Sequence, residues 1–126
     1  MDRHETKKQE SRLNEKFQKL ERQSKQIDVQ LTRNKQQLSR VEKLEQIFTD
    51  LSLRQKNQLE ELSVNWKGEY ARTVLSETAG NYQQFQRYQQ RELYETKREV
   101  IQNTRKLQQE QEKITQAKRL AVRGGR

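Results

Sequence analysis

The chain has no cysteine and no proline among its 126 residues, and it has only four glycines and one tryptophan. Without cysteine it forms no disulfide and offers no thiolate, which fits a reducing cytoplasm. No apolar run approaches the roughly 20 residues of a membrane span. The first ten residues also lack the apolar segment of a cleavable signal peptide. We therefore expect a cytoplasmic protein, or one that is co-exported by a route independent of a signal peptide.

Apolar residues are scarce at 29%, whereas charged residues make up 36%, so the chain cannot fill a thick globular core. Good helix formers (Gln, Glu, Lys, Arg and Leu) dominate, which favours long helices over disorder. The net charge is +9, divided as +3 over residues 1–65 and +6 over residues 66–126. From Lys113 onward the chain carries cations and no acid, which indicates an acidic partner, nucleic acid or simple solubility.

Apolar residues in the first half recur in alternating steps of four and three, which is the heptad pattern of a helix packed along another helix. The nine positions are Leu13, Phe17, Leu20, Ser24, Ile27, Leu31, Asn34, Leu38 and Val41. Ser24 and Asn34 are the polar interruptions, and such residues often fix register. Near Val41, Leu44 and Phe48 two short steps fall close together, so we predict a local slip of the pattern there.

Beyond that slip the apolar stripe widens, which predicts more than one packing neighbour. Its residues are Leu44, Ile47, Phe48, Leu51, Leu53, Leu59, Leu62, Val64 and Trp66. Trp66-Lys67-Gly68 then combines a large anchor with a residue that tolerates left-handed backbone, so we place the bend of a hairpin there. Gly80-Asn81 is a second turn candidate, and Thr49-Asp50 could cap a new helix.

The predicted fold is therefore all-α: a long antiparallel, coiled-coil-like helical hairpin over residues 11–121, with arms at 11–65 and 69–121. The alternative is a three-helix arrangement with breaks near Thr49-Asp50 and Gly80-Asn81. Residues 1–10 are predicted to fray and residues 122–126 to be disordered.

Two rows at seven-residue spacing mark the second arm. One row is apolar: Leu93, Val100, Leu107, Ile114 and Ala121. Its companion is polar: Lys97, Thr104, Gln111 and Lys118. With the bend at Gly68, Leu13 faces Ala121 and Leu31 lies near Leu107.

More apolar surface gathers around the bend than one thin partner helix can bury, so we expect that end to bind another protein. The predicted partner-binding residues are Phe48, Leu51, Leu62, Trp66, Tyr82 and Phe85. Ordinary hairpin packing is the alternative role for Tyr82, Phe85 and Tyr88. His4 has no converging ligands, and no catalytic set or phosphate loop is visible, so we expect no catalysis, metal or cofactor.

The Trp-x-Gly pattern at Trp66 and Gly68, between two helices, resembles the WXG-type, early-secreted-antigen-like superfamily of type VII secretion substrates. The likeness covers roughly residues 40–121. It is closest to the small helical partners encoded beside LXG toxins in Gram-positive bacteria, on LEELSVNWKGEYARTVLSETAGNYQQFQRYQQRELYETKREV. Tyr88 and Glu92 also fit a pattern that resembles the export signal of that superfamily. The chain departs from typical members in its greater length, its basic charge and its long N-terminal extension.

The resemblance implies a non-enzymatic targeting factor or chaperone that binds the N-terminal helical domain of an LXG toxin, with a second small helical protein as a further partner. One alternative is a coiled-coil stalk protein of a flagellar or type III export ATPase, which would make a secretion ATPase the partner. The other is a basic coiled coil that binds nucleic acid. We rank it low because the cations are interleaved with glutamates.

Overall fold

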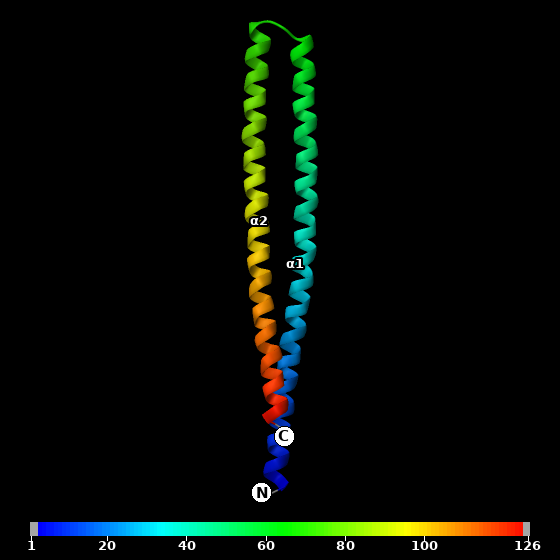
Figure 1. Ribbon diagram of the computed structural model, residues 1–126, viewed down its shortest axis with the longest axis vertical. Coiled ribbons are helices and arrows are strands. Elements are labelled where there is room, and N and C mark those ends of the chain that lie inside the picture. The colour runs from blue at the N-terminus through cyan, green and yellow to red at the C-terminus, as the bar shows by residue number, and fades with distance from the viewer. Residues whose placement is uncertain (1–2, 125–126) are drawn as a thin grey trace. The chain divides into compact units, whose positions relative to one another are not determined.

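The computed structural model describes residues 3–124, which form two long helices. Helix α1 spans Arg3–Asn65 and helix α2 spans Glu69–Gly124, joined by residues 66–68 (Figure 1). The prediction of an all-α helical hairpin is confirmed. Helix extends beyond the predicted arms, since α1 begins at Arg3 and α2 continues to Gly124. Residues 125 and 126 of the predicted disordered tail lie outside the described residues.

The bend between the helices depends on Gly68, whose φ of 122° is a conformation that L side chains rarely adopt. Hydrogen bonds close the helix end on each side. The backbone N–H of Trp66 donates to Leu62 O at 2.8 Å, and that of Arg72 donates to Gly68 O at 3.0 Å. A Cβ added at Gly68 would meet no atom within 4 Å. The requirement for glycine is therefore conformational and not a matter of space.

The two predicted extra breaks are wrong, because both sites lie inside continuous helix. Thr49 caps no new helix. Its hydroxyl instead donates to Glu45 O at 2.8 Å, one turn back in α1. Gly80 and Asn81 lie within α2, where a single glycine costs about 1 kcal/mol, an amount that neighbouring helix formers can offset. The three-helix alternative is thereby excluded.

The chain divides into two compact units, which are described separately. The terminal unit comprises the described parts of Met1–Gln36 and Ile101–Arg126, and the bend unit is Gln37–Val100. Buried apolar side chains are few among the described residues. They are Ile27 and Leu107 in the terminal unit, and Val41, Ala71 and Val100 in the bend unit. Each unit is therefore held by a narrow interhelical seam and not by a thick core.

The seam residues of α1, meaning its buried and half-buried positions toward α2, keep the alternating steps of four and three without interruption. In the terminal unit they follow the predicted heptad from Leu13 to Asn34. In the bend unit they are Leu38, Val41, Glu45, Phe48, Ser52, Gln55 and Leu59. The slip predicted in α1 is therefore wrong, since Glu45 and not Leu44 follows Val41 in the seam. Bringing Leu44 inward would overwind the helix locally.

The phase change lies on α2 instead. Its half-buried row contains two consecutive steps of four, from Gln89 to Leu93 and from Leu93 to Lys97. Further on, the row continues through Val100, Thr104, Leu107, Gln111, Ile114, Lys118 and Ala121. Two consecutive steps of four correspond to a four-residue insertion in the heptad repeat, which unwinds a coiled coil slightly at that point.

Every residue of the polar companion row on α2 has a partner on α1. In the bend unit, Lys97 Nζ lies 3.6 Å from Glu45 Oε1. In the terminal unit, Asn34 Nδ2 donates to Thr104 Oγ1 at 3.3 Å and to Asn103 Oδ1 at 2.8 Å.

The other two partnerships of this row also belong to the terminal unit. Gln111 Nε2 donates to Asp28 Oδ1 at 2.7 Å, and Lys118 Nζ lies 5.7 Å from the centre of the Phe17 ring. Leu31 lies between Asp28 and Asn34 on α1, and Leu107 lies between Thr104 and Gln111 on α2. The contacts of Asn34 and Gln111 are therefore on either side of the predicted Leu31–Leu107 pair. Polar contacts at a seven-residue spacing fix the register where the apolar seam is thin.

Candidate protein-binding surface of the bend unit

The seam of the bend unit contains several polar residues among its apolar ones. Its half-buried positions include Glu45, Ser52 and Gln55 on α1 and Gln86, Gln89 and Lys97 on α2. Two helices that pack only on each other normally place apolar residues at such positions. Polar residues at these positions leave part of the apolar residues of this unit outside the seam.

The apolar residues lie beside the seam instead. We use the term apolar flank for five side chains that are 42–59% exposed: Leu44, Ile47, Leu51, Phe85 and Tyr88. Leu44, Ile47 and Leu51 follow one another at helical spacing on α1. Phe85 and Tyr88 do the same on α2. Single exposed apolar residues are common on protein surfaces, but a contiguous group marks an interaction site.

The two halves of the apolar flank lie on the same side of the hairpin. Leu51 directly precedes the seam residue Ser52, and Phe85 directly precedes Gln86. Ser52 and Gln86 are equivalent seam positions, because the next seam residue follows each of them after three residues. An antiparallel pair has a twofold axis perpendicular to its plane, which keeps equivalent positions on one side. Leu51 and Phe85 also lie at similar distances from the bend.

The opposite side of the same unit is polar. Residues that directly follow a seam residue lie on that side, and they include the exposed residues Glu42, Thr49, Lys56, Gln83 and Gln90. Two exposed apolar residues, Leu53 and Tyr94, also lie on this side, since each directly follows a seam residue, Ser52 and Leu93 respectively. Leu53 and Tyr94 therefore provide matched controls for the apolar flank on the other side of the unit.

The predicted partner-binding residues separate into three groups. Leu51 and Phe85 belong to the apolar flank, whereas Phe48 and Tyr82 are half-buried in the seam behind it. Leu62 and Trp66 form the third group, beside the bend. Leu62 is about 16 Å from Leu51 along the helix axis at 1.5 Å per residue. Leu44 and Ile47 were recognised only as part of the wide stripe, and the structure adds them to the surface.

The bend carries a small aromatic group of its own. The Trp66 and Tyr70 rings meet edge to face, with centroids 6.0 Å apart and an interplanar angle of 76°. Both residues are exposed, Trp66 at 39% and Tyr70 at 76%. The Trp66 ring therefore contacts Tyr70 across the bend and still offers part of its indole to a partner.

Tyr88 and Glu92, the candidate export signal, are both exposed and lie one turn apart on α2. Tyr88 also belongs to the apolar flank. A protein bound on the flank would cover Tyr88, so this tyrosine cannot serve both roles at the same time.

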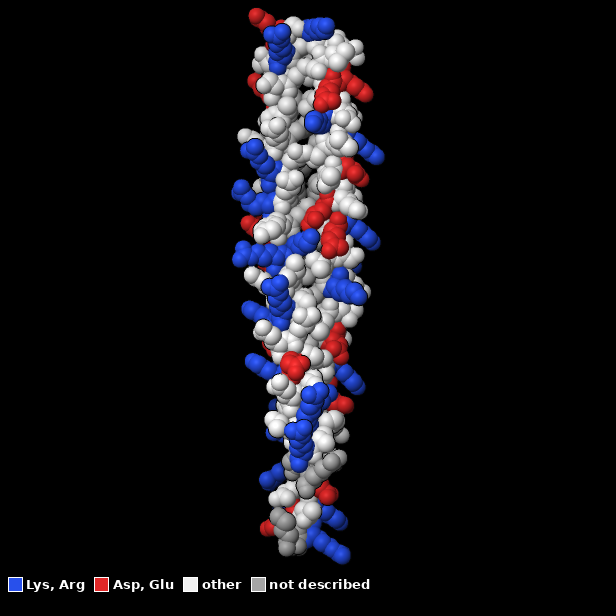
Figure 2. Space-filling view, in the orientation of Figure 1, with Lys and Arg blue, Asp and Glu red and all other residues white. Residues whose placement is uncertain are grey.

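Within residues 3–124 no group of three or more His, Cys, Asp or Glu side chains could hold a metal ion. Over the same residues neither helix is long and apolar enough to cross a membrane. On the face drawn in Figure 2, Lys and Arg are interspersed with Asp and Glu along both helices. This distribution differs from the basic stripe expected of a nucleic-acid contact surface.

Comparisons with models of protein families, with curated proteins and with solved structures found no match to this chain.

Proposed function

We propose that this chain is a non-enzymatic targeting partner that binds the N-terminal helical domain of an LXG-type toxin and promotes its type VII secretion. The observation that carries the proposal is the apolar flank, whose five exposed side chains from both helices lie on one side of the seam. Leu44, Ile47 and Leu51 have the spacing with which helices dock into apolar grooves. Trp66 and Gly68 at the observed bend support the type VII connection through their resemblance to the WXG pattern.

The size of the apolar flank limits what it can contribute. Fully burying a large apolar side chain is worth about 1.5–3 kcal/mol, and these five are roughly half exposed, so the flank supplies about 5 kcal/mol. Association alone costs about 4–15 kcal/mol. A stable complex therefore needs contacts beyond the flank. Leu62 and Trp66, on the same unit, are exposed apolar candidates for these contacts.

Co-expression with the toxin's N-terminal helical domain tests the proposal. The tagged chain should recover the domain, and the double variant Leu51→Ser/Phe85→Ser should lose it. The control variant Leu53→Ser/Tyr94→Ser removes a similar amount of exposed apolar surface from the other side and should retain binding. Trp66→Ala should weaken recovery without abolishing it. Equal recovery by both double variants would refute the flank as the docking surface, and no recovery by the unmodified chain would refute the toxin partnership.

The second candidate function is a stalk protein of a flagellar or type III export ATPase. The observed two-helix hairpin and the charge of +9 fit that role as well. Recovery of a secretion ATPase in place of the toxin domain, under the same conditions, would favour it.

The proposed targeting role also needs a signal for the secretion machine, for which Tyr88 and Glu92 are the candidates; of the two, Glu92 lies outside the apolar flank. Glu92→Gln should reduce secretion of the toxin and leave complex formation unchanged. Loss of the complex would assign Glu92 to docking instead.

A further inference from the structure

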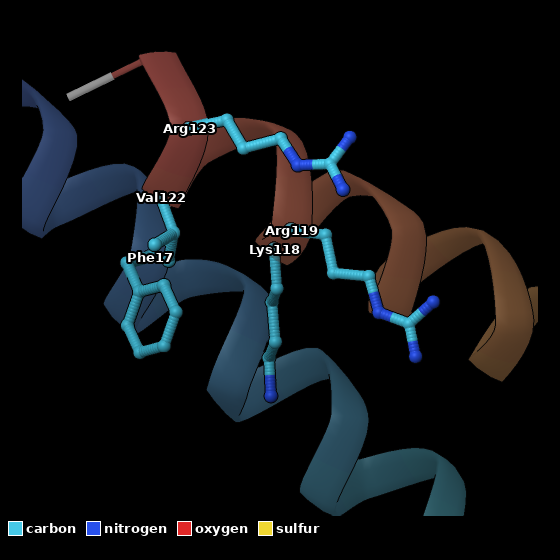
Figure 3. Close-up of a pocket in the computed structure, with 5 residues that line it drawn as sticks. All are labelled: Phe17, Lys118, Arg119, Val122 and Arg123. Atoms are coloured by element: carbon cyan, nitrogen blue, oxygen red, sulfur yellow. The ribbon is translucent and has the colours of Figure 1, made fainter. Parts of the chain in front are cut away.

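The last turns of α2 form a shallow basic groove with α1 in the terminal unit. Its volume is about 380 Å³, and it is lined by Phe17, Lys118, Arg119, Val122 and Arg123 (Figure 3). We call it the terminal groove. Four of its five lining residues lie in the segment from Lys113 onward that carries no acid, and Phe17 comes from α1. Its position in the terminal unit makes it a separate surface from the apolar flank of the bend unit.

The three cations of the groove have different roles. The amine of Lys118 is held against the Phe17 ring, 5.7 Å from the ring centre, and the side chain is half-buried. Arg119 and Arg123 are exposed, and neither forms an ion pair with any described residue. They lie one turn apart on α2, and in Figure 3 both guanidinium groups extend in the same direction. Two guanidinium groups are therefore available to a ligand.

A purely structural role accounts only in part for this pair. Cations in the last turn of a helix are stabilised by the carbonyl ends of the backbone, which applies to Arg123. Arg119 lies more than a turn before Gly124, where that effect fades. Like charges at a four-residue spacing also destabilise a helix. A bound anion would attract both guanidinium groups and so offset their mutual repulsion.

We propose that the terminal groove binds an acidic peptide segment of a partner protein. Carboxylates of the segment pair with Arg119 and Arg123, whose planar guanidinium groups match carboxylates in a two-pronged geometry. An apolar side chain of the same segment packs on Phe17 and Val122, the apolar part of the lining. This site does not depend on the function proposed for the bend unit.

Three other ligands fit the groove less well. Single-stranded nucleic acid is held by stacking of successive bases on several aromatic side chains, whereas Phe17 is the one aromatic residue of this lining. A lipid surface needs a broad apolar face, whereas the groove offers two apolar residues. A second copy of this chain also carries a charge of +9, with its acids interleaved among cations. A separate acidic segment has the complementary charge.

Fluorescence anisotropy on the full chain tests the site. The probe is a short labelled peptide in which glutamate alternates with leucine. Arg119→Gln/Arg123→Gln should weaken binding by about tenfold or more, since charge-assisted hydrogen bonds are the stronger class. The control Arg105→Gln/Lys106→Gln removes the same charge from two exposed positions of α2 and should change affinity by less than about twofold. Arg119→Lys/Arg123→Lys should give intermediate affinity, because lysine keeps the charge and loses the two-pronged geometry.

Four outcomes would overturn the proposal. The two glutamine variants could weaken binding equally, which would indicate general charge attraction. A peptide of glutamate and glycine could bind as tightly as the probe, which would remove the role of Phe17 and Val122. A labelled oligothymidylate, or vesicles containing phosphatidylglycerol, could bind more tightly than the peptide through Arg119 and Arg123. The peptide could also fail to bind the unmodified chain.

Discussion

Gly68 and Gly80 show how one residue type has opposite consequences at two places. Gly68 has a φ of 122°, so Gly68→Ala should lower the free energy of unfolding by about 1 kcal/mol or more. Gly80 lies inside α2 with open space around an added Cβ, so Gly80→Ala should raise it by about 0.5–1 kcal/mol. Urea denaturation of the two variants checks both signs. Equal effects at the two positions would contradict the assignment of the bend.

Gln111 is a polar seam residue whose removal should stabilise the protein. Its Nε2 donates to Asp28, but its Oε1 is buried without a hydrogen-bond partner. Gln111→Leu removes this orphan acceptor and adds apolar contact, while Asp28 remains exposed to water. We expect the free energy of unfolding to rise by about 1 kcal/mol. The exposed neighbour change Gln108→Leu should shift it by less than about 0.5 kcal/mol. A loss of stability in Gln111→Leu would show that the hydrogen bond from Gln111 Nε2 to Asp28 contributes more than the unpaired Oε1 costs.

At the scale of elements, residues of the seam should determine stability, whereas residues of the apolar flank should contribute mainly to binding. Leu107 is buried in the seam of the terminal unit, so Leu107→Ala should cost about 2–5 kcal/mol of unfolding free energy. Leu51 is 42% exposed on the flank, so Leu51→Ala should cost less than half as much. Thermal unfolding followed by circular dichroism measures both. A larger cost at Leu51 would mean that the flank is part of the folding core.

The sequence predicts the hairpin because its signals are local. The heptad steps from Leu13 to Val41 and the glycine at position 68 each lie within one helix or one turn. The phase of α1 past Val41 was predicted wrongly, because an apolar residue at Leu44 suggested a seam position. The helix keeps its repeat regardless of which residue falls on it, and Glu45 finds Lys97 across the hairpin. A pair so distant in sequence leaves no local signal.

The candidate surface was predicted only in part for a related reason. An excess of apolar residues around Leu51 and Phe85 is visible in the sequence, but the side on which they lie depends on the seam phase of both helices. The extra step near Leu93 on α2 and the uninterrupted repeat on α1 decide that phase. Leu62 and Trp66 were grouped with them because they are near in sequence, although they lie beside the bend.

At the scale of the whole molecule, the charge of +9 opposes self-association through the apolar flank. Salt screens this repulsion, since the Debye length falls from about 30 Å at 0.01 M to about 3 Å at 1 M. The isolated chain should therefore sediment as a monomer at low salt and associate as salt rises. Leu51→Ser/Phe85→Ser should remain monomeric at both ionic strengths. Salt-induced association of that variant, equal to that of the unmodified chain, would show that self-association uses a surface other than the apolar flank.

The most direct measurement is a cysteine footprint of the complex, which the cysteine-free sequence makes simple. Single cysteines replace Leu51 and Phe85 on the apolar flank, and Leu53 and Tyr94 on the other side. The rate of thiol alkylation is measured at low salt with and without the toxin's helical domain. We expect all four to react readily in the free chain, and the partner to protect only Leu51→Cys and Phe85→Cys. Equal protection of both sides, or protection of the flank in the free chain, would contradict the central claim that the apolar flank is the surface on which a second polypeptide binds.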